Sequence, residues 1–155
     1  MPYSRKARPD MPAQSQIGEL LTNEEWCLRL NLNPKARAFA EAYLVVTRTG
    51  EVKLGRFKTR KDPDAPSVVV VGGGKGTIAR AKAASRWMSP FPVITKTALE
   101  SADGTPLWRH RGLWRVVGHD IGTDSGRTKA LESAPHRAKD ENPPVGVLFL
   151  QQMPD

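Results

Sequence analysis

A run of glycines interrupted by one lysine is the stretch of this chain whose residue types could bind a phosphate. Residues 72–77 read Gly-Gly-Gly-Lys-Gly-Thr, after four consecutive valines and before an alanine-rich segment. Glycine permits a sharp turn that another group can approach closely, and backbone N–H groups at a helix start can hold an anion. The sequence therefore predicts a strand, a glycine turn and a helix, with either a phosphate or only tight packing at the turn.

Two known nucleotide-binding motifs do not fit this turn. The phosphate loop of nucleotide hydrolases needs glycine, four residues and then Gly-Lys-Ser/Thr. Val69 stands at the first glycine of that pattern, and Gly76 stands at the hydroxyl position. In the dinucleotide fingerprint, Thr77 takes the place of the third glycine. Both classes are excluded by spacing.

Basic side chains gather on the helix that follows and on a later strand. The expected nucleic-acid contacts are Lys75, Arg80, Lys82, Arg109, Arg111 and Arg115. The last three alternate along one strand, so we expect them to project from one face. Phosphates and base edges are natural partners of such a face, and a solvated charged surface is the alternative. The three tryptophans nearby, at positions 87, 108 and 114, are expected mainly in the core.

Residues for catalysis or metal binding are not arranged in any recognisable pattern. None of His110, His119 and His136 is spaced three or four residues from another histidine or from a cysteine. Cys27 is the only cysteine, which excludes an internal disulfide and a cysteine metal cluster and favours a small buried side chain. We expect no catalytic residue, no metal and no cofactor.

Composition points to a polyanionic partner. The 155 residues carry a formal net charge of +8 at pH 7, which favours nucleic acid first and an anionic membrane surface second. No apolar run approaches the roughly 20 residues that span a bilayer, and the basic N-terminus lacks the apolar core of a signal peptide. We expect an intracellular, cytoplasmic protein, associated with the nucleoid if it is bacterial.

Coarse patterns along the chain predict an α+β domain with a curled, mostly antiparallel sheet. Residues 1–16 are interpreted as a flexible basic arm, and residues 17–155 as one domain. One predicted helix begins at the capping box of Thr22 and Glu25, and two others cover residues 35–42 and 77–88. The predicted strands cover residues 43–48, 51–57, 68–71, 92–94, 107–118, with a bulge at Gly112, and 143–152. Residues 120–142 show no convincing period and are expected to form a long loop.

The order of these pieces resembles the SET-and-RING-associated domain, also called the YDG domain, which reads modified cytosines in DNA. That family has a strand ending in Tyr-Thr-Gly-x-Gly-Gly, an alanine- and leucine-rich helix, a Pro-Val-x-Val strand and then Tyr-Asp-Gly-Leu-Tyr-x-Val. This chain has Val-Val-Gly-Gly-Gly at 70–74, a helix at 77–88, Pro-Val-Ile at 92–94 and His-Arg-Gly-Leu-Trp-Arg-Val at 110–116. The match covers the middle third to half of the chain.

The resemblance implies a crescent-shaped barrel of the pseudouridine-synthase-and-archaeosine-transglycosylase (PUA-like) type that flips one base of duplex DNA into a pocket. The pocket residues that it implies are Phe57, Asp62, Asp64, Gly72, Gly73 and Gly74. Val70 stands where the second stacking tyrosine of the family is expected, and Arg111 replaces the aspartate of its name motif. Arginine suits a guanine edge or a phosphate.

These patterns lead to one main hypothesis, a non-catalytic module that reads a modified or flipped base in duplex DNA. By resemblance, it would serve a restriction or defence system together with a nuclease partner. The alternatives are a related RNA-binding module, a small enzyme on a nucleotide or base with Asp62, Asp64 or His119 as acid–base groups, and a basic structural protein of a viral particle or ribonucleoprotein.

Overall fold

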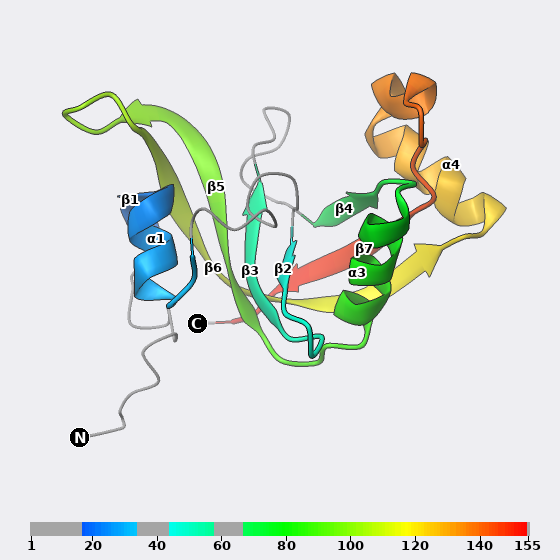
Figure 1. The fold of residues 1–155 in the computed structure, drawn as a ribbon, viewed down its shortest axis with the longest axis horizontal. Helices are drawn as coiled ribbons and strands as arrows, with labels where there is room; N and C mark the ends of the chain where they lie inside the picture. The colour runs from blue at the N-terminus through cyan, green and yellow to red at the C-terminus, as the bar shows by residue number, and fades with distance from the viewer. Residues whose placement is uncertain (1–16, 34–43, 58–66, 155) are drawn as a thin grey trace.

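Seven strands, three α-helices and one 3-10 helix make up the part of the chain described by a computed structural model, residues 17–33, 44–57 and 67–154 (Figure 1). The strands are β1 (Leu20–Thr22), β2 (Leu44–Val46), β3 (Val52–Phe57), β4 (Val68–Val71), β5 (Phe91–Glu100), β6 (Pro106–Ile121) and β7 (Gly146–Gln152). The helices are α1 (Asn23–Arg29), α3 (Lys75–Ser85), α4 (Asp124–Ser133) and the 3-10 helix η2 (Pro135–Lys139).

All seven strands belong to one curled sheet, in the order β2-β3-β5-β6-β7-β4, with β1 paired to β6. Among the described strands only β3 and β5 run parallel, and the other pairs are antiparallel. The sheet curls around α3 as a half-barrel, which leaves β2 and β4 as its two edges (Figure 1). The predicted α+β fold with a curled, mostly antiparallel sheet is therefore confirmed.

Local signals place most of these elements. The capping box is present, because the Thr22 hydroxyl accepts from the Glu25 N–H at 3.1 Å and the Glu25 carboxylate accepts from the Thr22 N–H at 2.9 Å. The β2–β3 hairpin turns at Gly50, which has a φ of +87°. The expected arm at 1–16 and the expected helix at 35–42 lie outside the described residues.

Two apolar clusters lie on opposite faces of the sheet. Val93 belongs to the cluster that α3 covers, whereas its neighbour Ile94 belongs to the cluster beside α1. Adjacent strand residues point to opposite faces. We call these the inner face, towards α3, and the outer face, towards α1.

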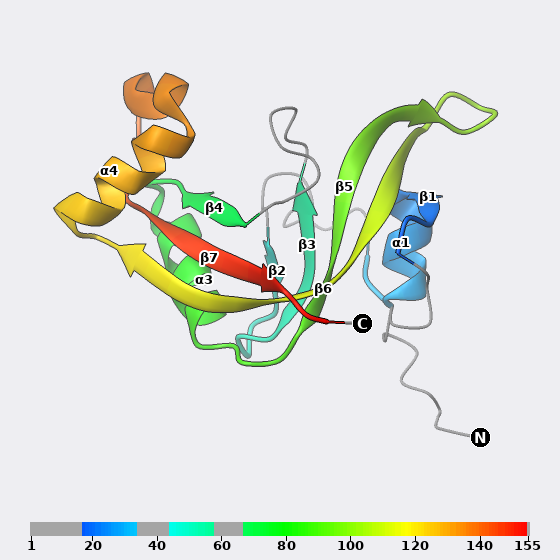
Figure 2. The same cartoon turned by 180° about the vertical axis from the view of Figure 1, so that it is seen from behind.

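Strand β6 contributes to both clusters because it changes face at a bulge. Trp108 lies in the outer cluster and Trp114 in the inner cluster. Between them the register with β5 shifts by one residue, and Gly112 adopts a φ of +90°, which disfavours any side chain. The expected bulge is confirmed, and Figure 2 shows how strongly β6 curves from its hairpin with β5 to the start of α4.

The expectation that the arginines of β6 share one face is wrong, because the bulge lies between them. Arg109 pairs with Thr95, and Thr95 in turn pairs with Phe57 of the inner cluster, so Arg109 lies on the inner face. Arg115 follows Trp114, an inner residue, and is exposed on the outer face. The extra residue at the bulge reverses the alternation that the sequence pattern assumed.

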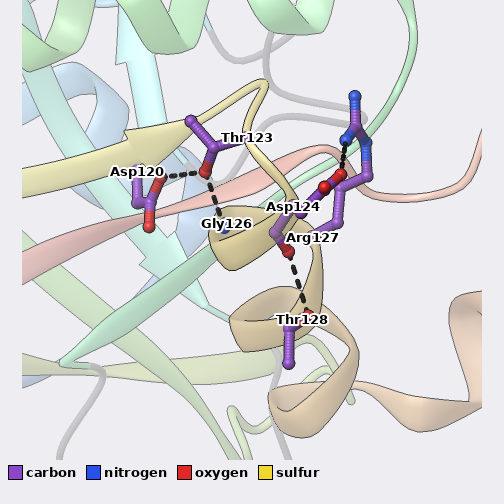
Figure 3. Close-up of polar contacts among 6 residues, drawn as sticks. All are labelled: Asp120, Thr123, Asp124, Gly126, Arg127 and Thr128. Carbon is purple, nitrogen blue, oxygen red and sulfur yellow. Dashed lines mark hydrogen bonds and ion pairs between the residues drawn. The ribbon is translucent and has the colours of Figure 1, made fainter.

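The prediction of a long loop at 120–142 is also wrong, because this segment contains α4 and η2. Thr123 caps α4 by accepting from the Gly126 N–H at 2.8 Å, and its hydroxyl also bonds the Asp120 carboxylate (Figure 3). The buried residues of α4 are the two small ones, Gly126 and Ala130. A helix that buries so little apolar surface gives no helical period in the sequence.

The carboxylate of Asp120 anchors α4 to the end of β6. Hydrogen bonds from Thr123, Lys129 and Ser125 hold the pKa of the Asp120 carboxyl below its usual range. The Lys129 ammonium lies 3.1 Å from this carboxylate. A lowered pKa in the folded state means that the contribution to stability is present above the unfolded-state pKa and is lost as the pH falls through the folded-state pKa.

Asp120→Asn should therefore reduce the free energy of unfolding at neutral pH, by an amount that shrinks with acidification. The difference from the wild type should be full above about pH 5 and should diminish below the ordinary aspartate pKa of about 3.9. Urea unfolding over a pH series measures it, with Glu132→Gln, which changes an exposed carboxylate of α4, as the control. A difference that does not change between neutral and acid pH would contradict this role.

Candidate functional site

A cavity of about 340 Å³ opens beside the glycine turn, at the seam between the two edge strands of the sheet. Its walls come from β2, β4, β7, α3, η2 and the segment that joins η2 to β7. The residues of its apolar floor are Leu44, Val46, Val69, Val71, Ala81, Ala84 and Leu148. Because the half-barrel does not close between β2 and β4, α3 covers the seam and leaves this space above its first turns.

Polar side chains form the rim of the cavity. They are Thr77, Arg80, Arg137, Asp140 and Asn142. The Arg137 Nε donates to an Asp140 carboxylate oxygen at 2.9 Å, and the Arg80 Nη2 lies 3.5 Å from the Thr77 hydroxyl. Arg80 forms no ion pair with any residue of the described segments, so its charge is not neutralised there. The rim thus offers two guanidinium groups and one carboxylate above an apolar floor.

The glycine turn is in close contact with the segment before β7. The Gly73 N–H donates to the Asn142 carbonyl at 3.3 Å, and a Cβ on Gly73 would lie 2.5 Å from the Pro143 carbonyl oxygen. A Cβ on Gly72 would lie 3.1 Å from the Arg137 Nη2. Glycine is needed at 73 because backbone approaches it, and at 72 the guanidinium of Arg137 rests against the turn.

Helix α3 begins directly at this turn. Gly74 is its N-cap residue, with no side chain that caps the first N–H groups, and Gly72, Gly73 and Gly74 all line the cavity. Uncapped N–H groups and the helix dipole give the start of α3 a partial positive charge. This charge adds to that of Arg80 and Arg137 at the same rim.

The structure brings together only part of the predicted site. Gly72, Gly73, Gly74 and Arg80 line the cavity. Lys75 and Lys82 are exposed on α3 outside the lining, and Arg109, Arg111 and Arg115 lie along β6 away from it. Phe57 is 4% exposed in the inner apolar cluster and does not line the cavity. Asp62 and Asp64 lie outside the described residues.

Three rim residues, Arg137, Asp140 and Asn142, were not predicted, because their segment was expected to be a loop. A weak signal for them exists in the sequence. Pro135 occupies the first position of η2, where proline is favoured, and His-Arg-Ala-Lys follows it. A basic turn after such a proline indicates a short helical element, but nothing in the sequence places it beside the glycine turn.

A second group of polar residues is buried on the outer face. The Arg56 guanidinium lies 5.1 Å from the centre of the Trp108 ring, and His110 lies 5.4 Å from Trp26, measured between ring centres. Burial raises the pKa of the neighbouring Cys27 thiol to about 11. The thiol is therefore protonated at neutral pH and is not a nucleophile. This group lies at the contact between α1 and the sheet.

Comparison with known proteins leaves the site to be interpreted from its geometry. No family model matches the chain, and no match is found among the curated proteins or the solved structures.

Gly73→Ala should open the contact between the glycine turn and the segment before β7. The new Cβ would meet backbone atoms that cannot move alone, so we expect a loss of about 1–3 kcal/mol in the free energy of unfolding, measured by urea titration. Gly76→Ala is the control, because its Cβ would meet only the Arg80 Nη1 at 3.6 Å. Alanine suits a helix better than glycine, so the control should be neutral or stabilising by up to about 1 kcal/mol. Equal effects of the two changes would contradict the backbone contact.

Proposed function

We propose that this protein is a non-catalytic nucleic-acid-binding module that takes one base of duplex DNA into the cavity beside the glycine turn. Its fold would be of the PUA-like type, similar to the SET-and-RING-associated domain. The observation that carries the proposal is the combination, in one cavity, of an apolar floor with two arginines at the rim.

The size of the cavity supports a ligand no larger than a nucleotide. Small-molecule sites in proteins typically have volumes of about 300–1,000 Å³, and the cavity of 340 Å³ lies at the lower end of this range. A base is flat and apolar on both faces and polar along its edge. The floor suits those faces, while Asn142 and the backbone at the edge of β4 can bind its edge.

The charge of the chain supports a polyanion as the larger partner. A net charge of +8 gives a long-range attraction for phosphate backbones, and Arg80, Arg137 and the exposed Lys75 concentrate positive charge around the cavity. Binding through phosphates releases counterions and so weakens as salt is added. The same contacts would hold the duplex while one base enters the cavity.

Among the described residues that line the cavity there is no aromatic side chain, whereas the SET-and-RING-associated domain has a stacking pair. Aliphatic side chains of β2 and β4, such as Val46 and Val71, occupy its floor. Contact with aliphatic groups excludes water from a base without ranking the bases by stacking strength. We therefore propose that selectivity comes from the ease of extrusion and from polar contacts to the base edge.

The order of the elements also supports the PUA-like assignment. Strand β4, the glycine turn, α3, β5 and β6 follow one another in the order that the resemblance requires, within a sheet that curls into a half-barrel. By the same resemblance, a nuclease of a restriction or defence system is the proposed partner.

Among the helices of the described segments, none is long and apolar enough to cross a membrane.

Val46→Phe should fill the cavity and abolish the selective part of binding. The wild type should bind a duplex with a central mismatch more tightly than a fully paired duplex, because a mismatched base costs less to extrude. In the variant this preference should disappear, while the affinity for the paired duplex and its salt dependence remain. Fluorescence anisotropy of labelled duplexes at two salt concentrations measures both quantities.

Val117→Phe is the matched control, because Val117 is 49% exposed on β6 and does not line the cavity. It should keep the preference of the wild type. Tighter binding of structured RNA than of every duplex DNA would instead select an RNA-binding module. Absence of binding, or binding without salt dependence, would contradict the proposed function.

A further inference from the structure

We propose that Arg80 and Arg137 hold the phosphate of the nucleotide that enters the cavity, and that Asp140 takes the place of this phosphate while the cavity is empty. The inference rests on the proposed function, since the ligand is a nucleotide, and it adds the phosphate contact and an internal competitor for it. The shared chemistry is a phosphate ester attached to a base, whether in a DNA strand or in a free mononucleotide.

The two guanidinium groups lie near the start of α3, Arg137 beside Gly72 and Arg80 beside Thr77. The Arg137 Nη2 would be 3.1 Å from a Cβ on Gly72, and the Thr77 methyl carbon would be 3.8 Å from that same Cβ position. The Arg80 Nη2 lies 3.5 Å from the hydroxyl of Thr77. Arg80 and Arg137 therefore flank Gly72 and Thr77 from two elements, α3 and η2, at the rim of one cavity.

Only one of the two arginines has an anionic partner. Arg137 is paired with Asp140, whereas Arg80 has no ion pair within the described part of the chain. A carboxylate resembles one side of a phosphate, because both offer two oxygens to the guanidinium fork. A phosphate has enough oxygens to bind both arginines at once, which the carboxylate of Asp140 does not do.

Exchange of Asp140 for a phosphate has a low cost. Asp140 is three residues from Arg137, and its side chain is 40% exposed while that of Arg137 is 24% exposed, so the carboxylate end of the ion pair is open to water. Exposed ion pairs of this kind contribute little to stability. When the phosphate arrives, Asp140 can turn into solvent, and the helix start at Gly74 adds favourable N–H groups beside the anion.

This arrangement predicts effects of opposite sign for neighbouring residues. Removing the competing carboxylate by Asp140→Asn should strengthen binding of a nucleoside monophosphate about two- to fivefold. This range corresponds to the free energy that a solvent-exposed ion pair contributes. Arg80→Gln and Arg137→Gln should each weaken it about tenfold or more, because each removes a charge-assisted hydrogen bond. Calorimetric titration of the full chain with nucleoside 5′-monophosphates, and with the same nucleosides without phosphate, measures these constants.

The chain offers matched controls for both kinds of change. Asp124 and Arg127 form an ion pair of the same type, with the same spacing of three residues and an N–O distance of 2.8 Å, but they do not line the cavity. Asp124→Asn changes the net charge as Asp140→Asn does and should leave the binding constant unchanged. Lys82→Gln, on the exposed side of α3, should also have no effect on the mononucleotide.

A second series with the mismatched duplex distinguishes the two sources of the phosphate. If the mononucleotide does not bind, but Asp140→Asn strengthens duplex binding more than Asp124→Asn does, the phosphate belongs to the DNA strand and the inference holds. If the mononucleotide binds as predicted but the duplex does not, the inference holds and the proposed DNA-binding function fails. The inference would be overturned if Asp140→Asn and Asp124→Asn had equal effects on both ligands. It would also be overturned if nucleoside and nucleotide bound with equal affinity and Asp140→Asn had no specific effect on duplex binding.

Discussion

The positive φ of Gly112 is the backbone constraint on which the arrangement of the sheet depends. At this point β6 moves its apolar side chains from the outer cluster, through Trp108, to the inner cluster, through Trp114. Without the extra residue, one of these two rings would face solvent. Since β6 pairs with β1, β5 and β7, the bulge links the packing of α1 on one face to the packing of α3 on the other.

The curl that β6 imposes also creates the site. The sheet bends until its edge strands β2 and β4 lie on either side of α3, and the cavity occupies the remaining seam. Its shape is then fixed by the backbone contact between Gly73 and the segment of Asn142 and Pro143. A floor from the barrel strands and a rim from α3 and η2 place apolar and cationic groups side by side. Such a pairing would fit the flat base and the charged phosphate of a nucleotide, as the proposed function requires.

Sequence patterns predict the elements whose signals are local. Four valines, three glycines and an alanine-rich segment specify β4, the turn and α3, and Gly112 marks the bulge. They could not predict which faces the arginines of β6 occupy, because the bulge reverses the alternation and only pairing with β5 shows this. They also missed α4 and η2, since α4 buries only Gly126 and Ala130 and is held by polar contacts of Thr123. Half of the site, Gly72 to Gly74 and Arg80, follows from sequence, and Arg137 follows only from the fold.

The proposed function requires that a base leave the duplex and enter the cavity beside the glycine turn. Replacement of the mismatched base by 2-aminopurine tests it most directly, because this fluorophore is quenched by stacking in DNA. The described residues of the cavity lining include no aromatic side chain that would quench it again. The fluorescence should rise when the wild-type protein binds and should not rise with Val46→Phe. Binding of the wild type without any change in fluorescence would mean that the base stays stacked and would contradict the proposed entry of a base into the cavity.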